Sequence, residues 1–143
     1  MKVETTRFGP IEIDEEKVFL FEKGILGFPE DQRYALLPHS ENSPFFWLQS
    51  LDSPDLAFVV INPALIVEDY SFEIPDEMGR ELELEESSQA EVLVLVTFRQ
   101  GNGEKPLHLS ANLLGPLIIN VKNRRACQAV LDPKKYPVRF EFS

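Results

Sequence analysis

The residue types that most often carry out catalysis or bind metal ions are scarce in this chain. Its 143 residues include two histidines, His39 and His108, and one cysteine, Cys127. The sequence has no paired cysteines and no His-Glu-x-x-His spacing, so it contains no recognisable set of metal ligands. We therefore expect neither a metal site nor a bound cofactor.

Hydroxyl and carboxylate groups are more plentiful, but they form no known catalytic pattern. Ser50 lacks the Gly-x-Ser-x-Gly context of a nucleophile elbow. Residues 103–105, Gly-Glu-Lys, lack the Gly-Lys-Ser/Thr ending of a phosphate-binding loop and are followed by Pro106. Acid–base catalysis by carboxylates would require a pair that converges on a cleft with separated pKa values. The sequence predicts a protein that is not an enzyme.

Charge is distributed unevenly along the chain, whose formal net charge is −10. Residues 68–91 contain ten acidic residues and one base, Arg80, whereas residues 122–139 contain six bases and one acid, Asp132. An acidic surface repels phosphate backbones, so we expect no direct binding of nucleic acid, while a basic protein partner would be steered toward it. The alternative is a solvated face that keeps the protein soluble.

The most informative segment is residues 45–63, FFWLQSLDSPDLAFVVINP. Two apolar runs flank a short polar turn at residues 52–54, which predicts one buried hairpin. Neighbouring side chains on a strand point to opposite faces, so at least one of Phe45, Phe46 and Trp47 should face outward. The alternative is a strand that is covered on both faces.

An outward aromatic side chain beside a carboxylate turn would suit a partner-docking point, because large aromatics dominate the energetics of interfaces. The candidate partner-binding residues are Phe45, Phe46, Trp47, Asp52 and Asp55, with Ile13 as a weaker candidate. The alternative assigns all six to the core or to turns.

The many prolines and short apolar runs favour an all-β fold, mainly antiparallel. We expect a small β-barrel-like single domain spanning residues 1–143, with one or two short helices. Besides the hairpin, strands are predicted at 2–8, 11–14, 18–21, 34–38, 71–74, 90–98, 106–109, 114–121, 126–131 and 138–142. A helix is predicted from about Glu77 to Leu84, capped by Asp76, with Met78 and Leu82 on its buried side.

Three connecting segments have distinct local signals. Gly24 and Gly27 permit a bend in which Ile25 and Leu26 are either exposed or plug one end of the barrel. Residues 64–67 fit a helical turn and the start of a strand equally well. Asn102-Gly103 favours a type I′ hairpin turn.

No stretch of the chain approaches the ~18 apolar residues of a membrane-spanning helix. The N-terminal residues lack the apolar core of a secretory signal. A lone cysteine cannot form an internal disulfide, and its apolar neighbours indicate a buried, inert thiol. We therefore expect a cytoplasmic protein that does not bind membranes and is a monomer when free.

Four blocks of this sequence occur in the order and spacing of a known family. They are Leu-Gln-Ser, Pro-Asp-Leu-Ala-Phe and Asn-Pro within residues 48–63, GILGF at 24–28, VLVLVTF at 92–98 and ANLLGPLIIN at 111–120. Because of these blocks the chain resembles the flagellar assembly factor FliW family, and the resemblance covers nearly the whole chain. Gly115 stands where an alanine is expected in that family.

The resemblance implies a small, β-rich, cytoplasmic binding protein with two partners, flagellin and the RNA-binding translational repressor CsrA. It implies that the protein prevents CsrA from repressing flagellin translation, by disfavouring the RNA-competent state rather than by covering the RNA surface, and that accumulating flagellin withdraws it from CsrA. Acidic character alone would fit phosphate mimicry equally well. The alternatives are an export chaperone for flagellin only and a ligand-binding β-barrel, for example for carbohydrate, without a regulatory role.

Overall fold

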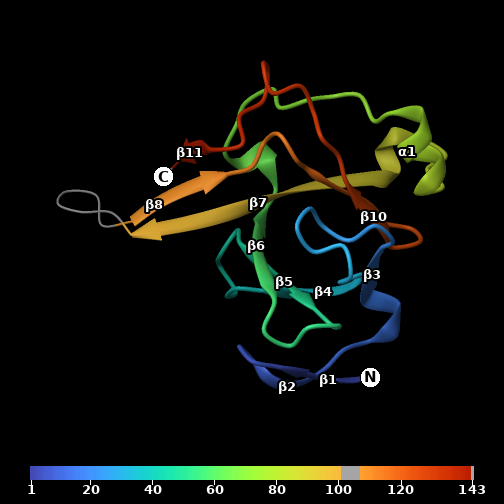
Figure 1. Ribbon diagram of the computed structural model, residues 1–143, viewed down its shortest axis with the longest axis vertical. Coiled ribbons are helices and arrows are strands. Elements are labelled where there is room, and N and C mark those ends of the chain that lie inside the picture. Colours follow the sequence, from blue (N-terminus) through green and yellow to red (C-terminus); the bar gives the residue numbers. More distant parts are fainter. Residues whose placement is uncertain (101–106, 143) are drawn as a thin grey trace.

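The longest strand, β7 (Ala90–Gln100), organises the fold because it pairs with three other strands. The computed structural model describes residues 1–100 and 107–142 (Figure 1). The first part of β7 pairs with β9 (Leu117–Asn120), its middle with β6 (Ala57–Ile61) and its last part with β8 (Leu107–Ala111), all antiparallel. The strand predicted at residues 90–98 is confirmed, and it is central in the sheet.

The sheet closes into a barrel through β7. From β7 the hydrogen-bonded order runs through β6, β5, β4, β3, β10 and β9, and β9 pairs with β7 again. These neighbours are antiparallel except for β3 and β10, which are parallel. The bounds of the remaining barrel strands are β3 (Val18–Phe21), β4 (Arg33–Pro38), β5 (Phe46–Ser50) and β10 (Arg125–Gln128). The predicted all-β, mainly antiparallel, small barrel-like domain is confirmed.

Two smaller parts attach to this barrel. Strand β11 (Phe140–Phe142) pairs with β8, and together they extend the sheet beyond β7. Strands β1 (Lys2–Thr5) and β2 (Gly9–Glu12) form a separate antiparallel ribbon, which lies at the end of the molecule opposite α1 (Asp76–Glu81) in Figure 1. The predicted hairpin of residues 45–63 is confirmed as β5 and β6.

The helix prediction was right in place and wrong at its ends. Helix α1 begins at Asp76, follows Pro75 and has no side-chain cap, so Asp76 is not its cap. It ends early because Glu83 adopts a left-handed conformation, with φ 57°, that a helix cannot continue. Met78 and Leu82 do share the buried side, against Ile118.

Several predicted strand limits differ from the structure for identifiable reasons. Residues 71–74 form no strand, because Phe72 and Ile74 pack onto an apolar cluster instead of pairing with a neighbour. Strand β9 begins at Leu117 because the Asn112 side chain accepts hydrogen bonds from the amides of Leu114 and Gly115, which makes a turn there.

The remaining differences lie at short turns. Residues 63–65 form a 3-10 helix, η2 (Pro63–Leu65), begun by the Asn62 side chain, so the helical-turn alternative for this segment holds. Two further 3-10 helices are η1 (Glu15–Lys17) and η3 (Ser87–Gln89). The Asn102-Gly103 turn lies outside the described residues.

One apolar cluster lies inside the barrel and includes Phe21, Tyr34, Leu48 and Val60, all with no exposed surface. The rings of Phe21 and Tyr34 meet edge to face with centroids 5.3 Å apart. At one end the glycine-bracketed loop inserts Ile25, which is 1% exposed, into this cluster, while Leu26 is 65% exposed. The loop therefore plugs the barrel with one of its two apolar side chains and exposes the other.

Cys127 lies half-buried on the outside of the barrel. Burial, together with the nearby Glu81 carboxylate, raises the pKa of its thiol to about 11, and Lys23 opposes this only in part. The thiol is consequently protonated, and weakly nucleophilic, at neutral pH.

Within the described residues, no three histidine, cysteine, aspartate or glutamate side chains gather in a way that could hold a metal ion. The same residues contain no helix that is long and apolar enough to cross a membrane.

Candidate partner-binding surface

Strand alternation separates the three aromatic residues at the start of β5. Phe46 points to the barrel interior and packs against the cluster that contains Leu48. Phe45 and Trp47 lie on the other face of the sheet, where Phe45 packs against a second buried cluster that includes Val94 and Val96. All three side chains are half-buried, so only part of Phe45 and of Trp47 is accessible to a partner.

Trp47 forms the centre of a small aromatic and cationic group. The Arg7 guanidinium carbon lies 4.2 Å from the centroid of the Trp47 ring, and the Phe8 ring meets it edge to face at 6.1 Å. The His39 ring also lies beside the Trp47 ring, with 6.3 Å between the ring centroids. A cation over an indole contributes about 0.5–1 kcal/mol at an exposed site. Trp47 therefore anchors the turn between β1 and β2 to the barrel and is only partly available to a partner.

Phe45 belongs to an apolar patch that sequence reasoning missed. Its ring lies 5.7 Å from that of Phe98 and 6.4 Å from that of Phe142. Phe98 is 42% exposed, and Leu107, on the adjacent strand β8, is 56% exposed. We call Phe45, Phe98, Leu107 and Phe142 the β8 patch. The signal that could have found it is the run of alternate apolar residues that continues past the buried part of β7.

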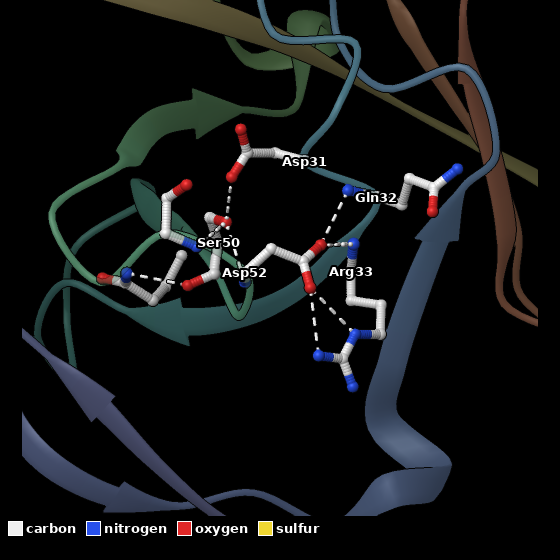
Figure 2. A network of polar contacts seen from close by, with 7 residues as sticks. Asp31, Gln32, Arg33, Ser50 and Asp52 are labelled. Carbon is white, nitrogen blue, oxygen red and sulfur yellow. Dashed lines mark hydrogen bonds and ion pairs between the residues drawn. The ribbon is translucent and has the colours of Figure 1, made fainter.

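The Asp52 carboxylate has a structural role, because it forms hydrogen bonds within the fold, as Figure 2 shows. Its carboxylate accepts hydrogen bonds from the backbone amides of Gln32 and Arg33, at 2.9 and 3.0 Å, and from the Arg33 guanidinium at 3.0 and 3.1 Å. Ser50 supports the same turn by donating to Asp31 at 2.8 Å and accepting from the amides of Asp52 and Ser53. These contacts fasten the hairpin turn to the start of β4.

The environment of Asp52 affects its acidity in two opposing ways. Partial burial would raise the pKa of this carboxyl, but the hydrogen bonds from Arg33 and Gln32 and the Arg33 charge together lower it. Asp55, in the same turn, is exposed. The turn lies at the far end of β5 from Phe46, roughly 16 Å along a five-residue strand. The structure does not bring the aromatic and carboxylate candidates together.

Ile13 lies beneath the β1–β2 ribbon. It is 8% exposed and packs with Val3 and Ala35. In this structure Ile13 and Asp52 both have a role in the fold, and their contact with a partner stays a prediction.

Replacing Asp52 with asparagine should lower the free energy of unfolding by about 1 kcal/mol at pH 7. This value is at the low end for charge-assisted hydrogen bonds because the Asp52 and Arg33 side chains are 27% and 51% exposed. The folded-state pKa is below the ordinary 3.8, so the stabilisation is present above that pH and is lost as the pH falls through the folded value. Urea denaturation at pH 7 and pH 3 should show the difference shrinking in acid. Asp55→Asn, as the control, should change stability by less than about 0.5 kcal/mol.

The acidic segment, residues 68–91, includes helix α1 and is largely exposed. Nine of its ten acidic residues are exposed, and the exception is Glu81, which pairs with Lys23 at 2.8 Å. Among the described residues, none of the other nine forms an ion pair. We call these nine residues the acidic surface: Glu68, Asp69, Glu73, Asp76, Glu77, Glu83, Glu85, Glu86 and Glu91.

Comparison with known proteins identifies the family of this barrel. The chain matches the FliW protein family over residues 2–142. It belongs to the FliW family of flagellar assembly factors.

Related FliW proteins are similar in sequence to nearly the whole length of this chain. The flagellar assembly factor FliW of Syntrophus aciditrophicus (strain SB) is 42% identical over 99% of this chain and 87% of that protein. The FliW of Treponema denticola is 41% identical over 99% of this chain and 92% of that protein. A crystal structure of the flagellar assembly factor FliW superposes with a TM-score of 0.85 at 31% identity, covering 98% of this chain and 95% of the other. The fold is therefore that of FliW.

Two kinds of contact show how FliW-like blocks of the sequence fix turns. The Gln49 amide donates to the carbonyls of Ser50, Pro54 and Leu56, at 3.0–3.2 Å, and so clamps the hairpin. The Gln128 amide connects two blocks, because its oxygen accepts from the Leu26 amide at 2.8 Å and its nitrogen donates to the Gly115 carbonyl at 2.9 Å.

Gly115, where the family resemblance leads one to expect alanine, has a packing explanation. A Cβ at this position would lie 2.8 Å from the Gln128 side-chain nitrogen. Glycine leaves the space that this amide occupies while it holds the loop at residues 24–28.

Proposed function

We propose that this protein is a partner switch that couples flagellin synthesis to flagellar assembly. It binds the RNA-binding translational repressor CsrA (carbon storage regulator), which relieves repression of flagellin translation. It also binds flagellin, and accumulating flagellin withdraws it from CsrA. It acts in the cytoplasm, as a monomer when free and as one domain of residues 1–143. The observation that carries this proposal is the acidic surface on a FliW-family barrel.

Charge complementarity supports CsrA as a partner. A repressor that grips RNA phosphates must present basic side chains, and an exposed surface of nine carboxylates attracts such a protein. Complementary charge mainly speeds the encounter and selects the partner. The same charge repels RNA itself, which is consistent with a protein that acts on the repressor and not on the message.

The β8 patch supports a second, apolar partner surface. Phe98 and Leu107 are 42% and 56% exposed, on β7 and β8, and the half-buried rings of Phe45 and Phe142 lie beside Phe98 or each other. Exposed apolar patches mark sites of protein–protein interaction, and a chaperone covers such surface on a subunit that is not yet assembled. Phe45 links this patch to the aromatic residues singled out in the sequence, and Trp47 and Asp55 stay candidates for further contacts.

Release of RNA from CsrA tests the proposal. A fluorescent RNA carrying a CsrA site is bound to CsrA, and its anisotropy is followed as this protein is added. We expect the anisotropy to fall toward that of free RNA. If the protein acts by disfavouring the RNA-competent state, the affinity of CsrA for RNA will fall to a limiting value as this protein is increased. If it acts by phosphate mimicry, the affinity will keep falling, because the protein and RNA then exclude each other. An anisotropy that does not change when this protein is in excess over CsrA would contradict the anti-repressor function.

A further inference from the structure

The β1–β2 ribbon is bonded closely within itself. We call residues 1–13, which contain both strands and Ile13, the flap. Its two strands pair with each other at four positions. The Ile13 amide donates to the Met1 carbonyl at 2.8 Å. The Thr5 hydroxyl donates to the Gly9 carbonyl at 2.7 Å. The flap is therefore a small unit with its own backbone pairing.

Few polar contacts join the flap to the barrel. Its strands form a sheet of their own and, among the described residues, pair with no barrel strand. Across the same residues one hydrogen bond reaches the barrel, from the Thr6 amide to the Pro54 carbonyl at 2.9 Å, and no ion pair does. The flap also places the Arg7 guanidinium and the Phe8 ring on Trp47. The flap is thus bonded more strongly to itself than to the barrel.

The apolar face beneath the flap is separate from the barrel interior. Val3 and Ile13 are 9% and 8% exposed and pack with Ala35, and Leu37 packs against the same cluster. This cluster shares no side chain with the cluster inside the barrel. The barrel closes through β3, β10 and β9, without either strand of the flap. Displacing the flap would therefore leave the strand pairing and the interior of the barrel intact.

A buried polar atom lies in the covered region. Gln49 pairs with Ala35 across β4 and β5, so both side chains are on the same face of the sheet. The Gln49 amide nitrogen donates to the Pro54 carbonyl, which also accepts the hydrogen bond from Thr6. Its amide oxygen is buried and, within the part of the chain that the structure describes, has no hydrogen-bond partner. An unpaired buried acceptor costs free energy that contact with water removes.

The connection from the flap to the barrel is fixed just after Asp14. The Asp14 side chain accepts a hydrogen bond from the Glu16 amide at 3.0 Å and so begins η1. The Arg124 side chain donates to the Glu16 carbonyl and holds η1 on the barrel. Movement of the flap would therefore turn about Asp14.

We propose that the flap is a hinged lid, which lifts about Asp14 while the barrel stays folded and so uncovers Trp47 and the face around Ala35. An isolated two-stranded ribbon is only marginally stable in water, so the flap loses its own pairing when it lifts. Water then reaches the face that the flap covers. The closed lid is an autoinhibitory contact, because a protein that requires the whole Trp47 ring binds only the open fraction, and its affinity is reduced by that fraction.

Native-state hydrogen exchange, followed by NMR, tests this lid. The amides of Thr6 and Ile13 report on the flap, and those of Leu48 and Val60, which are fully buried in β5 and β6, report on the barrel. We expect the two flap amides to share one protection factor, at least about 100-fold below that of the barrel amides. Equal protection of flap and barrel would show that the flap leaves only when the whole protein unfolds, and would overturn the proposal. Unequal protection of the two flap amides would indicate separate local fraying and would overturn it as well.

Two matched variants test whether the contact with Trp47 holds the lid closed. Arg7→Ala removes the cation over the ring, whereas Lys2→Ala removes an exposed cation of the same flap that, among the described residues, lies over no ring. We expect Arg7→Ala to speed exchange of the flap amides about two- to fivefold and to leave the barrel amides unchanged. Lys2→Ala should change both by less than about 1.5-fold. Equal acceleration of flap and barrel amides by Arg7→Ala, or equal effects of the two variants, would contradict the proposal.

Discussion

Replacing Gly24 with alanine is expected to lower the free energy of unfolding by about 3–5 kcal/mol and the melting temperature by roughly 10 °C. Gly24 has φ +68°, and a Cβ there would lie 2.3 Å from the Phe28 carbonyl oxygen and 2.7 Å from the Pro29 Cα. Both contacts are with backbone atoms, so the loop itself must move. The left-handed conformation contributes about 1–2 kcal/mol of this, and displacement of Ile25 from the barrel about 1.5–3 kcal/mol.

Gly9 provides the matched control for this substitution. It has the same φ of +68°, but a Cβ there would meet nothing within 4 Å. Gly9→Ala should therefore reveal the conformational contribution alone, about 1–2 kcal/mol. Thermal denaturation of both variants measures the difference. Equal losses would show that the loop does not hold Ile25 in the way described.

Replacing Phe46 with alanine should lower the free energy of unfolding by about 3 kcal/mol, the low end of the range for such changes in a core. The reason is that the ring packs against the apolar cluster inside the barrel, although it is half-buried where it lines a cavity of about 520 Å³. In a chain of this size the melting temperature should fall by about 6–12 °C. Differential scanning calorimetry measures this directly.

Leu65→Ala provides a comparison at the same cavity, because Leu65 is exposed and should leave the melting temperature within about 2 °C. If Phe46→Ala instead leaves the melting temperature unchanged, the packing of this ring against the barrel interior is wrong.

The parts of the fold that follow local patterns were predictable from the sequence. The hairpin of β5 and β6 and the central strand β7 were recognised because continuous apolar runs bounded by turn residues have few other interpretations. No local pattern in the sequence predicted which strands pair to close the barrel. The parallel pair of β3 and β10 and the pair of β7 and β9 join segments far apart in the chain, and their register depends on packing.

The candidate partner-binding residues could be proposed from the sequence, but their placement in the fold could be predicted only in part. Alternation required that Phe45 and Trp47 share a face opposite to Phe46, but only tertiary pairing decides which face is inside. The role of Asp52 depends on amides about 20 residues earlier, at Gln32 and Arg33, which no local pattern reveals. The cavity lined by Phe46 had no local signal, although alternation places Glu91 on the same face of β7 as the buried Leu93.

The most direct test of the partner switch is calorimetric titration of this protein into purified CsrA, repeated in the presence of monomeric flagellin. We predict saturable binding to CsrA that flagellin abolishes. Failure to bind CsrA, while flagellin is still bound, would contradict the translational half of the proposal and leave an export chaperone.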